Sequence, residues 1–139
     1  MKNLATCKPS EFLIQTNKIR KSVEKWLDAT DIMNIRKRIP QYEVVGLTAT
    51  PEEKAEINAR NEVRKQQQLK KNLSDMFDSI LERHPQETLE VMALCCFVEP
   101  ENVDDHPMSE YLQAVNDLIG NAEVLNFFTL LVQLAQKNT

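Results

Sequence analysis

One short stretch of this chain concentrates the side chains most able to do chemistry. Four carboxylates and one imidazole fall within eight residues, at Glu99, Glu101, Asp104, Asp105 and His106. Such a cluster could hold a divalent cation, but a calcium-binding loop needs a glycine for its tight turn. This stretch has no glycine, and Pro100 interrupts it. We therefore expect these side chains to cap helices and face solvent, with no metal ion and no cofactor.

The cysteines and histidines also lack a catalytic pattern. Cys95 and Cys96 are adjacent on an expected apolar helix, where burial raises the pKa of a thiol and makes it a poor nucleophile. His84 and His106 do not have the HExxH spacing of a zinc protease. Three cysteines without a CxxC pair indicate neither a disulfide framework nor a zinc site. The sequence predicts that this protein is not an enzyme.

Charge is divided unevenly along the chain. The net charge is −4, yet residues 1–71 carry 15 Lys and Arg against 9 Asp and Glu, and residues 72–139 carry 2 against 12. The simplest interpretation is that the two halves attract each other, within one chain or between subunits. The one basic concentration comprises Lys18, Arg20, Lys21, Lys25, Arg36, Lys37 and Arg38. No recognition-helix pattern accompanies it, so we expect no nucleic-acid partner.

Length and composition favour one helical domain. A chain of 139 residues can bury one core, and two glycines are few for a sheet protein, whose tight turns use glycine. The longest apolar run, residues 91–98, is far shorter than the roughly 20 residues needed to span a bilayer. The first residues lack the apolar segment of a secretory signal. We expect a cytoplasmic protein without membrane contact.

The most apolar stretch, residues 86–98, should be the central, buried helix of the fold, with Pro85 in its first turn. The spacing of apolar residues predicts further helices over residues 11–29, 32–38, 108–119 and 122–136. Ser10 is the expected N-cap of the first helix, Ser109 or Asp105 that of the helix from residue 108, and Asn121 that of the last. Gly120 is expected just after the helix that ends at Ile119, as a C′ residue.

The clearest local signal is Thr50-Pro51-Glu52-Glu53, in which the threonine and Glu53 can form a capping box. It predicts a helix that runs to Arg83. Residues 54–68 are nearly all polar, so they should project into solvent or be partly disordered. The apolar residues that follow should be core, namely Leu69, Leu73, Met76, Phe77, Ile80 and Leu81. Residues 41–48 should be a loop with a short strand, and a strand is also the alternative for residues 33–40.

These elements predict an all-α fold, either a compact bundle or an orthogonal array of about five to six helices with a long polar central helix. We expect one domain over residues 1–139. It would have a flexible arm at residues 1–8, a loop and projecting helix at 41–68, and core helices at 69–136. The broad apolar face of the last helix is typical of a surface that pairs with another chain. The candidate partner-binding residues are Trp26, Leu27, Phe127, Phe128 and Leu131.

Four segments carry a family resemblance: MKNLATCKPSEFL, KIRKSVEKW, HPQETLEVMALCCFVEPENVDDHP and NFFTLLVQLAQ. Together they resemble small helical proteins of phage and prophage tail-gene clusters in gut Firmicutes, which are similar to the tail assembly chaperones of long-tailed phages. The resemblance covers most of the chain, and residues 43–70 look like its variable part. It implies an all-helical protein in the bacterial cytoplasm that coats the tape measure protein before the tail tube polymerises.

The resemblance also implies no cofactor and no active site. The alternative interpretation is a small helical adaptor or regulatory protein that binds one folded partner through helix contacts and forms a homodimer. Both interpretations predict protein partners and self-association, and they differ in the kind of partner.

Overall fold

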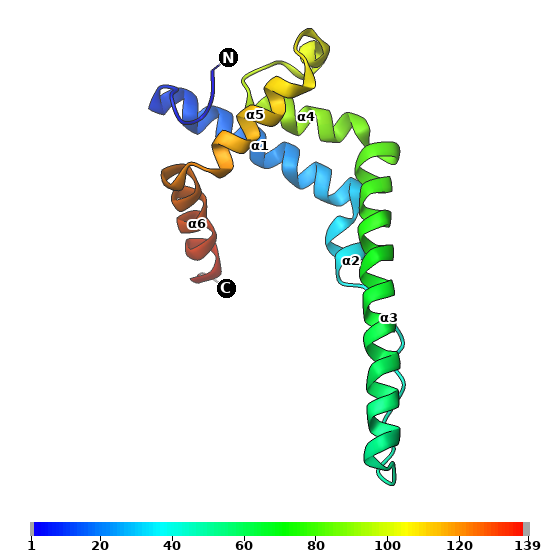
Figure 1. The fold of residues 1–139 in the computed structure, drawn as a ribbon. Helices are drawn as coiled ribbons and strands as arrows, with labels where there is room; N and C mark the ends of the chain where they lie inside the picture. Colours follow the sequence, from blue (N-terminus) through cyan, green and yellow to red (C-terminus); the bar gives the residue numbers. More distant parts are fainter. Residues whose placement is uncertain (1, 138–139) are drawn as a thin grey trace. The chain divides into compact units, whose positions relative to one another are not determined.

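A computed structural model describes residues 2–137, except for the side chains of residues 131, 132 and 135–137. The all-α prediction is confirmed, because this part of the chain contains helices and no strand (Figure 1). The elements are α1 (Pro9–Thr30), α2 (Ile32–Arg36), α3 (Pro51–Phe77), the π-helix η1 (Asp78–Arg83), α4 (Pro85–Cys95), the 3-10 helix η2 (Pro100–Asp105), α5 (Met108–Ile119) and α6 (Ala122–Lys137).

The chain divides into two compact units. Unit 1 comprises Met1–Trp26 and Gln86–Thr139, and unit 2 comprises Leu27–Pro85. The first helix therefore contributes most of its length to the unit that contains α4, α5 and α6. That the two units fold together as one domain stays a prediction.

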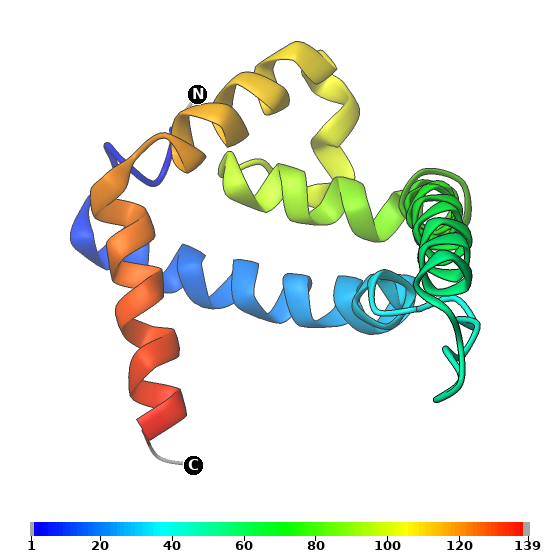
Figure 2. The same ribbon diagram turned by 60° about the horizontal axis from the view of Figure 1, so that its bottom comes forward.

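In unit 1, α4 runs antiparallel to the first part of α1 (Figure 2). The side-chain amide of Gln15 donates to the backbone oxygen of Leu94 at 2.6 Å. Near the other end of the pair, the indole N–H of Trp26 donates to the hydroxyl oxygen of Thr88 at 2.9 Å. These two bonds fix the register of α4 on α1.

The core of unit 1 is built around Tyr111 of α5, whose side chain is 2% exposed. Its hydroxyl donates to the backbone oxygen of Val103 at 2.7 Å, which ties η2 to α5. Ala93 and Cys96 are buried in the same unit. Burial raises the pKa of the Tyr111 hydroxyl above its ordinary value, so it stays a hydrogen-bond donor at neutral pH.

Residues 2–7, expected as a flexible arm, form a turn in unit 1. The side-chain oxygen of Asn3 accepts from the backbone N–H of Ala5 at 2.9 Å, and the side chain of Leu4 is buried. Glu11 accepts hydrogen bonds from the Lys2 ammonium and from the backbone N–H of Lys8. These contacts lower the pKa of the Glu11 carboxyl.

Helix α4 ends at Cys95, three residues before the predicted end at Val98. The backbone N–H of Val98 donates to the oxygen of Ala93 at 3.0 Å, and that of Phe97 donates to the oxygen of Leu94 at 3.3 Å. This is a Schellman motif, in which the C′ residue takes the left-handed conformation. Phe97 occupies that position with φ of 58°. Glycine usually occupies this position, so a phenylalanine there does not signal that α4 ends at Cys95.

In unit 2, α2 packs against α3 through Ile32 and Ile35, which are 8% and 3% exposed. Two polar side chains from the long helix complete this packing. The amide of Asn72 donates to the backbone oxygen of Arg38 at 2.9 Å, and the hydroxyl of Ser79 donates to the backbone oxygen of Thr30 at 2.7 Å. Helix α2 ends at Arg36, two residues earlier than predicted.

The segment over residues 41–45 lies along α3 as an extended loop, and the predicted short strand does not form there (Figure 1). The side chain of Asn61 bonds both the backbone N–H and the backbone oxygen of Glu43, at 2.9 and 3.0 Å. The Glu43 carboxylate pairs with Arg60 at 2.7 Å. The Asn61 side chain thus makes the hydrogen bonds that a neighbouring strand would make. The backbone N–H and oxygen of Glu43 are therefore paired without a sheet.

The capping box at Thr50 and Glu53 is confirmed, with the Thr50 hydroxyl accepting from the backbone N–H of Glu53 at 3.1 Å. The helix continues through η1 to Arg83, as predicted. Its second half, however, is not the core that its apolar residues predict. Four of them are 49–63% exposed, namely Leu69, Leu73, Phe77 and Leu81, and we call them the α3 stripe.

The helix caps are predicted with mixed success. The side chain of Asn121 accepts from the backbone N–H of Val124 at 3.1 Å, so the predicted cap of α6 is confirmed. Gly120 has a right-handed φ of −76° and does not act as a left-handed C′ residue. Pro107 occupies the N-cap position of α5, so neither Ser109 nor Asp105 caps that helix. Helix α1 begins at Pro9, so Ser10 lies inside it.

Candidate functional site

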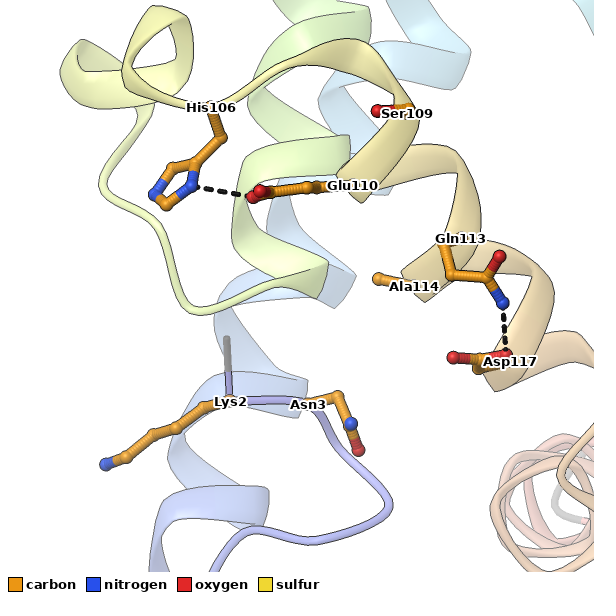
Figure 3. A pocket seen from close by; sticks show the side chains of 8 residues that line it. All are labelled: Lys2, Asn3, His106, Ser109, Glu110, Gln113, Ala114 and Asp117. Carbon is orange, nitrogen blue, oxygen red and sulfur yellow. Dashed lines mark hydrogen bonds and ion pairs between the residues drawn. The ribbon is translucent and has the colours of Figure 1, made fainter.

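The acidic stretch near His106 borders a pocket of about 460 Å³ in unit 1 (Figure 3). The lining residues come from the N-terminal turn, from the end of η2 and from α5, namely Lys2, Asn3, His106, Ser109, Glu110, Gln113, Ala114 and Asp117. The Nδ1 atom of His106 lies 2.8 Å from the Glu110 carboxylate. His106 is the one member of the acidic stretch that lines this pocket, and the four carboxylates at Glu99, Glu101, Asp104 and Asp105 do not.

In the part of the chain that the structure describes, the His106 imidazole bonds the Glu110 carboxylate, and no serine, threonine or cysteine side chain is hydrogen-bonded to it. Figure 3 shows Ser109 in the first turn of α5, and no hydrogen bond joins it to the imidazole among the drawn side chains. A serine nucleophile would need that bond to its base. Within residues 2–137, no three His, Cys, Asp or Glu side chains are placed to hold a metal ion. The pocket is a polar surface depression, and the proposals below do not depend on it.

The adjacent thiols of Cys95 and Cys96 are placed unfavourably for reaction. Burial, and to a smaller extent the neighbouring Cys96, raise the pKa of the Cys95 thiol to about 11. Cys96 is 1% exposed, and burial raises the pKa of its thiol as well. A thiol with such a pKa is almost entirely protonated at neutral pH, and the thiolate is the nucleophile. The expectation that the protein is not an enzyme stays a prediction.

The basic residues of α1 face acidic ones. Lys18, Lys21 and Lys25 line a depression of about 340 Å³ together with Glu90 and Glu99. The ammonium of Lys25 pairs with the Glu90 carboxylate at 3.1 Å. Because two carboxylates share this surface with three lysines, its positive charge is smaller than the lysine count suggests.

The predicted partner-binding residues do not form one group. Trp26 lies in unit 1 and bonds Thr88, whereas the next residue, Leu27, belongs to unit 2. Phe127 packs edge-on between Phe12 of α1 and Phe128, with ring centroids 5.2 and 5.8 Å apart. Phe127 therefore joins α6 to α1 inside unit 1. The side chain of Leu131 is outside the described part of the chain.

Other apolar side chains are left at the surface of unit 1. On α5, Met108, Leu112 and Ile119 are 49%, 57% and 62% exposed, and they share one side of the helix with the half-buried Val115. We call these four residues the α5 stripe. Leu125, Leu130 and Leu134 of α6 are also exposed. The sequence predicts core helices over residues 69–136, with Leu112 and Ile119 turned inward, so the exposure of these two side chains corrects that prediction.

No protein-family model, curated protein or solved structure matches this chain significantly. The class that the fold defines is therefore an all-α protein in two units. Among the described helices, none combines the length and the apolar character that crossing a bilayer requires.

Proposed function

We propose that this chain is a non-enzymatic protein-binding protein of the tail assembly chaperone type. Its client would be the tape measure protein, whose apolar helical segments it would cover in the bacterial cytoplasm before the tail tube forms. The observation that carries the proposal is the α5 stripe, with three large apolar side chains about half exposed on one side of a helix. The sequence resemblance supplies the identity of the client.

An exposed apolar row on a helix fits a partner helix with apolar residues at i, i+3, i+4 and i+7. The α5 stripe has this spacing, because its members are separated by four, three and four residues. Adjacent exposed leucines on α6 extend the apolar surface that unit 1 can offer. A tape measure protein consists largely of long helices, so it offers many segments of the required kind.

The expected strength of one contact suits a coat that must later be removed. Full burial of a Leu, Ile or Met side chain contributes about 1.5–3 kcal/mol, and these side chains are already half buried. One stripe therefore contributes only about 3 kcal/mol, before the entropy cost of association. Many weak contacts along one long client give a stable coat without any strong individual site.

Co-expression with the tape measure protein encoded beside this chain tests the proposal. We expect the chain to increase the soluble fraction of the client several-fold. Leu112→Glu should abolish the effect, because it places a charge in the stripe. Gln113→Glu is the matched control, since it adds the same charge to an exposed position off the stripe, and it should leave the effect intact.

Equal client solubility with and without the chain would contradict the proposal. If the Leu112→Glu variant still increased the soluble fraction of the client, the α5 stripe would not be the surface that binds it. A 1:1 complex with a folded partner, and none with the tape measure protein, would favour the adaptor interpretation.

A further inference from the structure

The exposed apolar side chains of α5 and α6 lie in a segment whose charged residues are all acidic. Residues 86–136 contain nine Asp and Glu and no Lys or Arg. This segment supplies η2, α5 and almost all of α4 and α6. A partner that binds the α5 stripe therefore meets carboxylates from these elements, and it meets no ammonium or guanidinium group from them.

The basic residues of unit 1 lie on other surfaces. Three lysines of α1 line the depression beside α4 together with Glu90 and Glu99. Lys2 lies by the pocket that Glu110 and Asp117 also line (Figure 3). At 100° per residue, these two acidic side chains are on the side of α5 opposite the α5 stripe. They do not border the stripe, and Lys2 does not neutralise the carboxylates that do.

The 3-10 helix η2 brings two carboxylates to the border of the α5 stripe. Tyr111 lies four residues before Val115, a member of the stripe, and its hydroxyl donates to the backbone oxygen of Val103 at 2.7 Å. The next two residues, Asp104 and Asp105, are exposed. Burial raises the pKa of the Tyr111 hydroxyl, and the carboxylates of Asp105 and Asp104 raise it further, so both charges are close to this side chain.

On α6, a further carboxylate is in line with the exposed leucines. Glu123 precedes Leu130 by seven residues and Leu134 by eleven. These intervals are close to two and three helical turns, so the three side chains lie along one side of the helix. All three are exposed. The apolar surface of α6 is therefore also accompanied by a negative charge.

We infer that the helix bound by the α5 stripe carries Lys or Arg beside its apolar residues, so that the client segments are basic amphipathic helices. The inference rests on the proposed function, because it specifies the kind of client helix. Opposite charges at the border of an interface accelerate association and select the partner, while the apolar contacts supply most of the affinity. An acidic helix with the same apolar spacing would meet like charges at Asp104, Asp105 and Glu123.

Two synthetic peptides of equal length test the charge of the partner. Both have leucine at i, i+4, i+7 and i+11, and one has four lysines beside the leucines where the other has four glutamates. Fluorescence anisotropy measures their binding to the full chain. At about 50 mM salt the lysine peptide should bind at least about tenfold more tightly, and at about 500 mM this ratio should fall to about twofold, because salt screens exposed charges.

A variant without the apolar contact separates specific binding from general attraction between opposite charges. Leu112→Gln leaves the net charge unchanged and replaces a member of the α5 stripe by a polar side chain. It should weaken binding of the lysine peptide at least about fivefold, because the contact requires the apolar row.

Two double variants locate the attraction on the surface. Asp104→Asn/Asp105→Asn should weaken binding of the lysine peptide about fivefold at low salt. Glu110→Gln/Asp117→Asn is the matched control, since it removes two charges from the opposite side of α5, and it should weaken binding less than about twofold. Circular dichroism of each variant checks that the helices are retained.

The inference is overturned if neither peptide binds, if the glutamate peptide binds as tightly as the lysine peptide, or if Leu112→Gln binds the lysine peptide like the wild type. Equal losses in the two double variants would also overturn it. Failure of the proposed function is a separate result, because it appears as equal solubility of the tape measure protein with and without the chain, whichever peptide binds more tightly.

Discussion

The two units differ in how they use buried polar groups. Unit 2 buries Asn72 and Ser79, and each donates a hydrogen bond to a backbone oxygen at least 34 residues away. Unit 1 buries the hydroxyls of Thr16 and Ser22, and neither has a hydrogen-bond partner among the described atoms. Unit 1 compensates with a tyrosine and several apolar side chains that are almost fully buried. Unit 1 also has directional bonds, from Gln15 to the Leu94 backbone and from Tyr111 to the Val103 backbone, so the units differ in the two buried hydroxyls that unit 1 leaves without a partner.

The two units also differ in where they leave apolar surface. Side-chain bonds to the backbone can attach the loop before α3 and α2 to the long helix without covering its opposite side. Unit 2 is therefore held together while the α3 stripe remains exposed. In unit 1, the buried face of α5 centres on Tyr111, and the α5 stripe lies beside that face. Three sets of substitutions test the comparison, and the largest expected effect comes first.

Tyr111→Ala should destabilise unit 1 by about 3–5 kcal/mol, because it leaves a cavity in the core and removes the hydrogen bond to Val103. Thermal unfolding followed by circular dichroism measures the loss. Tyr111→Phe is the control and should cost about 1 kcal/mol, since it removes the hydrogen bond alone. A loss below about 1 kcal/mol for the alanine variant would contradict an apolar core centred on Tyr111.

Asn72→Ala should destabilise unit 2 by about 1–3 kcal/mol, because it deletes a buried side chain that donates a hydrogen bond to the backbone oxygen of Arg38. Hydrogen exchange can locate the loss, which should appear in α2 and in the middle of α3. Gln66→Ala, at an exposed position of the same helix, should change the free energy of unfolding by less than about 0.5 kcal/mol. Faster exchange confined to unit 1 would be the opposite result.

The smallest effects are expected for two serine-to-alanine substitutions, one in each unit. They should change the free energy of unfolding in opposite directions. Ser79→Ala should cost about 1 kcal/mol, because the hydroxyl donates to Thr30. Ser22→Ala should stabilise by about 1 kcal/mol, because it removes a buried hydroxyl without a partner and introduces the best helix former. Chemical denaturation of both variants measures the difference. If both substitutions changed the free energy of unfolding in the same direction, the two units would not differ in how they accommodate buried hydroxyls.

Much of the secondary structure follows from local sequence signals. The capping box at Thr50, the cap at Asn121 and Pro85 in the first turn of α4 are each found where the sequence predicts them. Local signals fail where the backbone takes an unusual conformation for its residue type. Phe97 adopts a left-handed conformation and ends α4 early, whereas Gly120 remains right-handed.

The candidate surfaces could be predicted only in part. Periodicity identified the apolar rows on the long helix and on α5, since it needs only the spacing of residues along one helix. It wrongly assigned the α3 stripe to the core, and it could not show that the Phe127 ring packs against Phe12. Whether an apolar row is buried depends on residues far away in the sequence, and no local pattern contains that information.

The sequence by itself determined that this protein is helical, that its long helix begins at Thr50, and that its charge changes sign near residue 71. These properties depend on neighbouring residues, whose physical chemistry acts over a few positions. Only the tertiary structure decided which apolar faces are paired, because covering a helix requires a second element from elsewhere in the chain. It covered Tyr111 and left the α3 and α5 stripes exposed, and the α5 stripe is the surface on which the proposed function rests.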